Sequence, residues 1–276
     1  MTTPSPRSEI DMVVVPYIGA LGRIEMLSTV KTRLVQSQSL GYDGISELLP
    51  RATVFANAAS VHEASTAELA LTLVLASQRG IREFVHSSLE GHWAPAWFDS
   101  LADRTVMIIG HGGVGRAIED RLAGFEVKLV RVAQHARSDE RGEIHAVSSL
   151  PELLPDADIV IVIVPLDETT THLVDDRFLS QLKDGALVVN VSRGRVFDTS
   201  AVITHAQRGR LRFALDVVDP EPLPDGHVLF TLENVLITPH VGGASSAMLP
   251  RIARLVNSQI SRLLNGEEPL NVVLRT

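Results

Sequence analysis

An apolar run that leads directly into closely spaced glycines, at residues 105–115, constrains the fold of this chain more than any other feature. Val106–Ile109 has the composition of a buried strand, and the pattern Gly110-x-Gly112-x-x-Gly115 follows at once. Beyond the glycines, apolar residues recur at helical spacing. These are Val114, Ala117, Ile118 and Leu122. The stretch therefore predicts a strand, a tight glycine turn and a helix.

A turn of this kind is suited to hold a pyrophosphate group. Glycines let the backbone come close to phosphate oxygens, and the free N–H groups and positive dipole of a helix N-terminus attract the anion. We expect a dinucleotide to be bound here through the backbone of Gly110, Gly112, Gly113, Val114 and Gly115.

Strand-like and helix-like runs alternate along the chain, which is typical of an α/β fold built on a parallel sheet. We predict strands at residues 12–15, 33–36, 54–56, 106–109, 127–130, 159–164, 187–191, 213–216 and 235–237. We predict helices at 63–79, 114–123, 149–154, 175–182, 198–208 and 244–264, with an irregular connector at 86–104 and an extended tail at 266–276. The pattern Ser65-x-x-Glu68 predicts a capping box at the start of the first helix.

Charge and composition argue against several classes of protein. The net charge of −8 disfavours a general surface for nucleic acid or anionic membranes. The chain has no cysteine, which excludes disulfides and thiolate metal sites, and we single out no metal site of another kind. No apolar run reaches the roughly 18 residues of a membrane span, and the first residues lack the apolar core of a signal peptide. We therefore expect a cytoplasmic protein.

Three polar motifs follow later strands of the predicted sheet. They are Asn190–Gly194 (NVSRG), Ala214–Leu223 (ALDVVDPEPL) and Thr238–Gly243 (TPHVGG). Each lies at the carboxyl end of a predicted strand, and this is the edge of an open α/β sheet where ligands bind.

Taken in order, the glycine loop and these motifs resemble the D-isomer-specific 2-hydroxyacid dehydrogenase family over about residues 53–276. The resemblance implies a Rossmann-type, dinucleotide-binding domain at residues 86–244. It also implies a smaller, discontinuous, flavodoxin-like substrate domain at residues 1–85 and 245–276. Relatives normally have a strand, a helix and a second strand before the segment that matches Met12–Val15. We therefore expect that this domain is abbreviated, that the true start of the chain lies further upstream, or that Thr2–Asp11 forms a reduced version of the missing part.

The resemblance further implies hydride transfer between NAD(P)H and C2 of a small 2-keto or 2-hydroxy acid (D-isomer), of the glyoxylate or hydroxypyruvate type. Arg193 matches the arginine that binds the substrate, and a guanidinium offers a planar fork to a carboxylate. His240 matches the general acid/base. Glu221 matches the carboxylate paired with that histidine, which would stabilise the imidazolium. Asp216 matches the residue that orients the nicotinamide amide.

Further positions follow from the same resemblance. Cofactor contacts beyond the glycine loop are expected at Pro165, Val191, Asp216, His240 and Gly242. Relatives hold the substrate carboxylate with a glycine-containing loop that matches residues 39–44, which makes Leu40, Gly41 and Tyr42 substrate-binding candidates beside Arg193. A plain loop is the alternative there. The helix at 63–79 matches the element through which relatives usually dimerise, so a homodimer is expected.

The choice between NAD and NADP depends on the residue that ends the second strand of the dinucleotide-binding domain. Sites that prefer NAD usually have an acidic residue there, which binds the ribose 2′-OH. We align Arg131 with this position, and His135 and Arg137 follow it. A cation can pair with the 2′-phosphate, so the sequence predicts a preference for NADP(H). The alternative is that Arg131 faces solvent and the protein is indifferent.

A second function stays open beside the reductase. The family also includes transcriptional corepressors, which respond to dinucleotides without catalysis and can retain the same three residues. Some residues also have purely structural interpretations. Glu221 lies between Pro220 and Pro222, where a plain turn is common, and His111 in the glycine loop could contact phosphate through its backbone alone.

Overall fold

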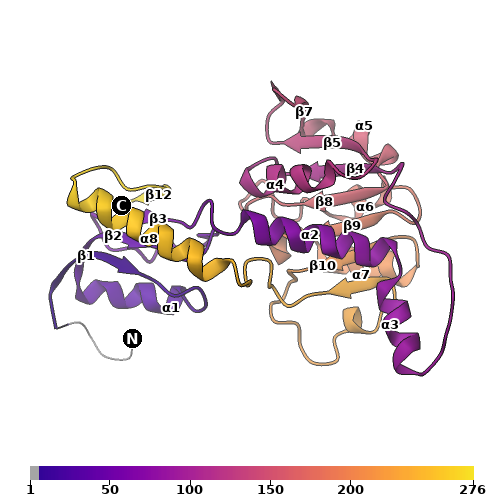
Figure 1. The fold of residues 1–276 in the computed structure, drawn as a ribbon, viewed down its shortest axis with the longest axis horizontal. Helices are drawn as coiled ribbons and strands as arrows, with labels where there is room; N and C mark the ends of the chain where they lie inside the picture. The colour runs from indigo at the N-terminus through magenta and orange to yellow at the C-terminus, as the bar shows by residue number, and fades with distance from the viewer. Residues whose placement is uncertain (1–5) are drawn as a thin grey trace. The chain divides into compact units, whose positions relative to one another are not determined.

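The computed structural model describes residues 6–276, and they fall into two compact units (Figure 1). The smaller unit combines the chain up to Glu63 with Gly243–Thr276, and the larger unit is Ala64–Gly242. The sequence placed the first boundary after residue 85. The difference arises because the two helices that span residues 63–89 belong to the larger unit. The Arg82 side chain, for example, donates to the carbonyl of Val235 at 2.6 Å.

An eight-stranded sheet forms the centre of the larger unit, in the order β11-β10-β9-β8-β4-β5-β7-β6. Its strands are β4 (Thr105–Ile109), β5 (Lys128–Ala133), β6 (Arg137–Asp139), β7 (Gly142–Ala146), β8 (Ile159–Val162), β9 (Leu187–Asn190), β10 (Arg212–Leu215) and β11 (Val235–Ile237). Every neighbouring pair is parallel except β6 and β7. The strands β8 and β9 are buried at every position, as their apolar composition requires. The α/β fold with a Rossmann-type sheet is thus confirmed.

The helices of this part of the chain are α2 (Glu63–Gln78), α3 (Ile81–Leu89), α4 (Gly113–Leu122), α5 (Leu150–Leu153), α6 (Asp176–Ser180) and α7 (Thr199–Gln207). The main core lies where α6 and α7 meet the sheet. It contains Phe178, Leu179 and Val202 from the helices, packed in one cluster with Val160 and Val188 from the strands. Burial of such side chains is the main source of the fold's stability.

The order of the strands creates a switch point beside β4. From β4 the chain moves outward through β5 and β7, and it then returns to the other side of β4 as β8. The connections that leave β4 and β8 therefore diverge at the carboxyl edge of the sheet, which opens a crevice for a ligand in folds of this type. The glycine loop follows β4 at this point.

Several elements were not predicted from the sequence. The β6–β7 hairpin consists mostly of exposed polar residues, so it shows no apolar alternation. Helix α3 has no buried residue. Part of the expected irregular connector at 86–104 is therefore helical, although residues 92–100 are indeed irregular and exposed. The expected extended tail forms a strand, β12 (Val272–Arg275), antiparallel to β3.

The smaller unit has a four-stranded sheet in the order β1-β2-β3-β12. Its elements are β1 (Glu9–Val14), α1 (Leu21–Ile24), β2 (Lys31–Gln36), β3 (Val54–Ala56), α8 (Met248–Leu264) and β12. Helix α8 begins four residues later than predicted and packs Ile252 and Leu255 against Ala58 and Val61. No helix within residues 6–276 is long and apolar enough to cross a membrane.

The start of α2 differs from the predicted capping box. Ser65 lies inside the helix and is buried. The carboxylate of Glu63, in the first turn, instead accepts the backbone N–H of Ser60 at 2.5 Å. The glutamate at the start of the helix thus satisfies a backbone donor upstream of it, and Ser65 does not mark the start of the helix as the sequence suggested.

Candidate active site

The glycine loop joins β4 to α4 and has the shape of a phosphate cradle. Gly110 has a φ of +106°, and a side chain there would collide with the carbonyl of Ile163. A Cβ at Gly115 would collide with the carbonyl of Gly110, so the helix packs directly on the turn. Gly112, just before α4, has open space where its Cβ would be. The cradle fits a dinucleotide pyrophosphate because Gly110 and Gly115 allow the tight turn, and Gly112 has no side chain that would block a phosphate from approaching the backbone.

Strand β5 continues beyond the end that the sequence suggested. It ends at Ala133, so Arg131 lies inside the strand, and the position assigned to it is wrong. Its guanidinium is mostly buried, 3.3 Å from the carboxylate of Glu119 and 3.5 Å from that of Asp139. An arginine can occupy this mid-strand position because the carboxylates of α4 and β6 neutralise it. The residue at the carboxyl end of the strand is the small, non-acidic Ala133.

The turn after β9 is held by the side chain of Asn190, which the sequence did not single out. Its Oδ1 accepts the N–H and the hydroxyl of Ser192 at 3.0 and 2.7 Å, and its Nδ2 donates to the carbonyl of Arg193 at 3.0 Å. At Gly194 a Cβ would collide with the carbonyl of Val218. Arg193 is half-buried and is therefore carried by a turn with little conformational freedom.

Asp216 follows β10 and shapes the loop that contains His240. Its buried Oδ1 accepts the hydroxyl of Thr238 at 2.6 Å and the N–H of Val241 at 2.9 Å. Its Oδ2 accepts the N–H of Gly242 at 2.9 Å, and its carbonyl accepts the N–H of His240 at 2.7 Å. The sequence singled out Asp216 only through its match to the family residue that orients the nicotinamide amide, and not for this loop-holding role. Its expected contact with the nicotinamide amide stays a prediction.

The structure brings two of the candidate catalytic residues together. Nδ1 of His240 lies 2.6 Å from Oε1 of Glu221, and both side chains are about two-fifths exposed. His240 has a φ of +53°, a left-handed conformation that the bonds of its loop to Asp216 support. Because an ionised carboxylate only accepts hydrogen bonds, Nδ1 carries the hydrogen of this one. Within residues 6–276, Nε2 has no protein partner. The pair can therefore hold a proton at Nε2 or take one there.

Two other predicted cofactor positions lie at the same edge of the sheet. Val191 follows β9 and is buried, with its N–H donated to the carbonyl of Val162 at 3.2 Å. Pro165 lies shortly after β8 and is exposed, and its carbonyl accepts the hydroxyl of Thr170 at 2.7 Å.

The predicted substrate loop lies in the smaller unit, after β2. The carbonyl of Leu40 accepts Nδ2 of Asn57 at 2.9 Å, which fixes one end of the loop. Gly41 is half-buried and Tyr42 is exposed. Arg193, the other candidate for substrate binding, belongs to the larger unit.

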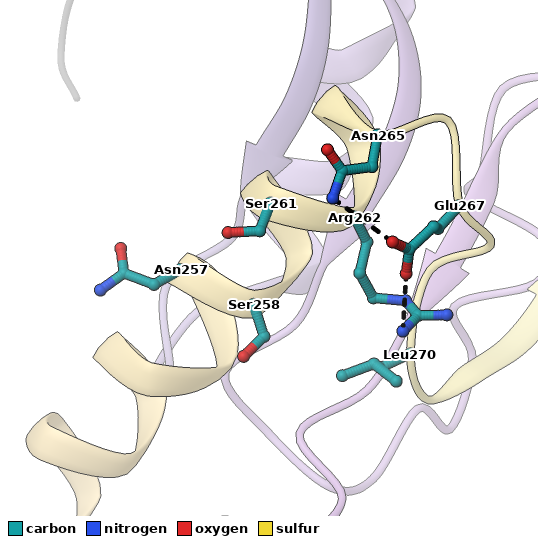
Figure 2. Close-up of a pocket in the computed structure, with 7 residues that line it drawn as sticks. All are labelled: Asn257, Ser258, Ser261, Arg262, Asn265, Glu267 and Leu270. Atoms are coloured by element: carbon teal, nitrogen blue, oxygen red, sulfur yellow. Dashed lines mark hydrogen bonds and ion pairs between the residues drawn. The ribbon is translucent and has the colours of Figure 1, made fainter.

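A polar hollow on α8, drawn in Figure 2, is a separate feature of the smaller unit. Its lining includes Arg262, Asn265 and Glu267. The carboxylate of Glu267 lies 3.1 Å from the Arg262 guanidinium and accepts Nδ2 of Asn265 at 3.3 Å. These polar groups therefore bind one another, and none of the predicted site residues lines the hollow.

Comparisons with known proteins agree with this arrangement. The model of the NAD-binding domain of D-isomer-specific 2-hydroxyacid dehydrogenases matches residues 71–242. A glyoxylate reductase of Pyrococcus horikoshii is 31% identical over 97% of this chain and 84% of its own length. A glyoxylate reductase of Korarchaeum cryptofilum is 33% identical over 88% of this chain and 76% of its own. Among solved structures, a D-isomer-specific 2-hydroxyacid dehydrogenase from Xanthobacter autotrophicus, in complex with NADPH, is 28% identical with a TM-score of 0.80, over 97% of this chain and 85% of the other.

Proposed function

Because the chain belongs to the D-isomer-specific 2-hydroxyacid dehydrogenase family, an NAD(P)-dependent group of oxidoreductases, we propose that it reduces a small 2-keto acid of the glyoxylate or hydroxypyruvate type to the D-2-hydroxy acid. The observation that carries this proposal is the 2.6 Å contact between His240 and Glu221 beside the carboxyl edge of the sheet. Both curated relatives described above are named glyoxylate reductases, which supports a small keto acid as the substrate.

His240 acts as the acid of the reduction. When a dinucleotide is held by the glycine loop, it would supply a hydride to C2, and negative charge would develop on the keto oxygen. The imidazolium of His240 gives the proton from Nε2 to this oxygen, while Glu221 at Nδ1 stabilises the positive ring before the transfer and orients it. In the reverse direction the neutral ring accepts the hydroxyl proton at the same nitrogen.

Arg193 holds the substrate. A guanidinium can bind a carboxylate with two parallel hydrogen bonds and can polarise the neighbouring keto oxygen. One N–H of Arg193 donates to the Ser192 carbonyl at 2.7 Å, which restricts the guanidinium before the substrate arrives. Fixing the position of the reacting group in advance lowers the entropic part of the barrier.

The proposed cofactor preference is for NADP(H) over NAD(H). At the end of β5, Ala133 leaves no carboxylate to repel a 2′-phosphate. The cation that we assign to that phosphate is Arg137 rather than Arg131, because the exposed Arg137 guanidinium already reaches the glycine loop, where it donates to the His111 carbonyl at 3.1 Å.

The proposed function is tested by following the oxidation of NADPH and of NADH with a panel of keto acids: glyoxylate, hydroxypyruvate, pyruvate and phenylpyruvate. Turnover with a small member of the panel is expected, faster with NADPH. If no keto acid is reduced while the dinucleotide still binds, the reductase proposal is wrong and the non-enzymatic alternative of the corepressor type takes its place.

We also propose that the protein forms a homodimer through the region that follows α2. The apolar side chains of α2 are buried or half-buried, whereas α3 and the connector after it leave apolar side chains in solvent. Trp93 and Trp97 are 97% and 101% exposed, which is unusual for residues of this size. The proposed surface consists of Ile81, Val85, Leu89, Trp93 and Trp97.

A further inference from the structure

A buried charged cluster adjoins the glycine loop, and the proposed chemistry makes no use of it. His111, the second residue of the loop, has a fully buried imidazole whose Nε2 lies 2.7 Å from Oε2 of Glu119 in α4. Oε1 of Glu119 lies 3.3 Å from Nε of Arg131 in β5. Oε2 lies 3.6 Å from Arg141, in the β6–β7 turn. The cluster therefore joins the loop to the helix after it and to the neighbouring strand.

The charges around Glu119 define the direction of the bond to His111. Two guanidinium groups pair with the Glu119 carboxylate, and a carboxylate in an ion pair only accepts hydrogen bonds. Nε2 of His111 is consequently the donor. The other ring nitrogen, Nδ1, is buried and has no hydrogen-bond partner within residues 6–276, so the bond to Glu119 is the polar contact that holds the ring.

The backbone of His111 is held as well as its side chain. Its carbonyl accepts the Arg137 guanidinium at 3.1 Å. His111 is flanked by Gly110 and Gly112, which have no side chains to restrain them, and glycine backbones lose the most conformational entropy when they become ordered. Because His111 is held through both its side chain and its carbonyl, it can set the shape of the whole loop before a ligand binds.

We propose that the His111–Glu119 bond is a positioning element that preorganises the glycine loop for the dinucleotide. Preorganisation lowers the ordering cost of binding, so the bond strengthens cofactor affinity and leaves the chemical step nearly unchanged. Neither His111 nor Glu119 is placed to contact the reacting atoms. Both act through the backbone of the glycine loop. This inference rests on the proposed function only in that the loop binds a dinucleotide.

The test compares two variants that differ in reach. In His111→Asn the amide is too short to reach Glu119, whereas in His111→Gln the longer amide can still donate to it. We expect the Kd of NADPH, measured by calorimetric titration, to rise about tenfold in His111→Asn and much less in His111→Gln. We expect kcat at saturating cofactor to stay near the wild-type value in both.

A matched control lies next to Glu119 on the same helix. Asp120 is an exposed carboxylate that bonds Arg141 at 2.6 Å and has no contact with His111. Asp120→Asn removes a negative charge beside the cluster without touching His111, and it is expected to leave the Kd of NADPH within about twofold of wild type, since it breaks no contact of the loop.

Hydrogen exchange of the protein without ligand provides a second measurement. In His111→Asn, the amides of residues 110–115 should exchange faster, while those of β8 stay protected and show that the sheet is folded. Wild-type cofactor affinity in a folded His111→Asn, or equal weakening by Asn and Gln, would overturn the inference, as would a wild-type protein that binds no dinucleotide. If the protein binds NADPH but reduces no keto acid, the reductase proposal is wrong. The comparison of NADPH affinities between the His111 variants would still decide whether the His111–Glu119 bond preorganises the loop.

Discussion

At the scale of single residues, the site depends on how each polar side chain is held. The carboxylate of Asp216 accepts three hydrogen bonds from the loop of His240, and the side chain of Asn190 makes three within the turn of Arg193. These two supporting residues are buried, while His240 and Glu221 remain accessible. A rigid support with an exposed functional group is what a preorganised site needs.

The role of His240 is tested by His240→Ala. We expect kcat for the reduction to fall by on the order of 10² or more, because the proton donor is lost. The Kd of NADPH should change little, since the glycine loop is untouched. The measurement combines steady-state kinetics with calorimetric titration of the cofactor. Near-normal turnover would remove His240 from the mechanism.

The role of Glu221 is tested by Glu221→Gln, which keeps the size of the side chain and removes its charge. The imidazolium of His240 then loses its ionic partner at 2.6 Å, and we expect kcat to fall about tenfold. Glu233→Gln, at an exposed glutamate before β11, is the control for loss of one negative charge. Equal rates for the two variants would show that Glu221 is only a turn residue.

The cofactor preference is tested by Arg137→Ala. We expect the Kd of NADPH to rise about tenfold more than the Kd of NADH, because only NADPH has the 2′-phosphate. The ratio of the two values isolates this effect from any general change of the loop. If the ratio of the NADPH Kd to the NADH Kd equals that of the wild type, Arg137 does not bind the 2′-phosphate.

At the scale of elements, one carboxylate ties together the ends of two central strands. Asp158, just before β8, accepts the N–H of Thr105 in β4 at 2.7 Å and lies 2.9 Å from the ammonium of Lys183. Partial burial by itself raises the pKa of Asp158, but the hydrogen bonds from Lys183 and Thr105 and the charges of Lys183 and Arg104 outweigh it, and the pKa is lowered.

Asp158→Asn should therefore destabilise the protein by about 1–2 kcal/mol at neutral pH, as measured by urea denaturation. A lowered pKa means that the folded state favours the ionised form. The contribution of Asp158 is thus fully present above its unfolded pKa of about 3.9 and disappears as the pH falls through the lower folded value. The stability difference between wild type and variant should shrink in that range. A difference that is independent of pH would contradict the ionic origin.

Elements with a strong apolar pattern were predicted well, and those without one were not. The strands β8 and β9 and the helices α4 and α7 lie within a few residues of their predicted ranges, since burial on both faces or on one stripe leaves a clear signal. The β6–β7 hairpin is formed mostly by exposed polar residues whose pairing depends on the neighbouring strand. No local pattern indicates such a contact in advance.

At the scale of the whole molecule, the exposed apolar surface after α2 predicts association. We expect the wild type to sediment as a dimer and the double variant Trp93→Ser, Trp97→Ser to shift toward the monomer, because each removed indole loses apolar area buried in the interface. Leu264→Ser, at an 82% exposed residue of α8, is the control and should stay dimeric. A wild type that sediments as a monomer would refute the homodimer.

The sequence by itself determined the fold class, the position of the glycine loop and the residues of the three strand-end motifs. It could do so because these features are local: a buried strand, a turn that only glycine can form, and short motifs fixed to strand ends. Only the tertiary structure decided that β5 extends to Ala133, that Arg131 is neutralised by Glu119 and Asp139, and that Asp216 holds the loop of His240. Each of these depends on side chains that are distant in sequence and meet only after the sheet has formed, so no spacing within the chain could reveal them.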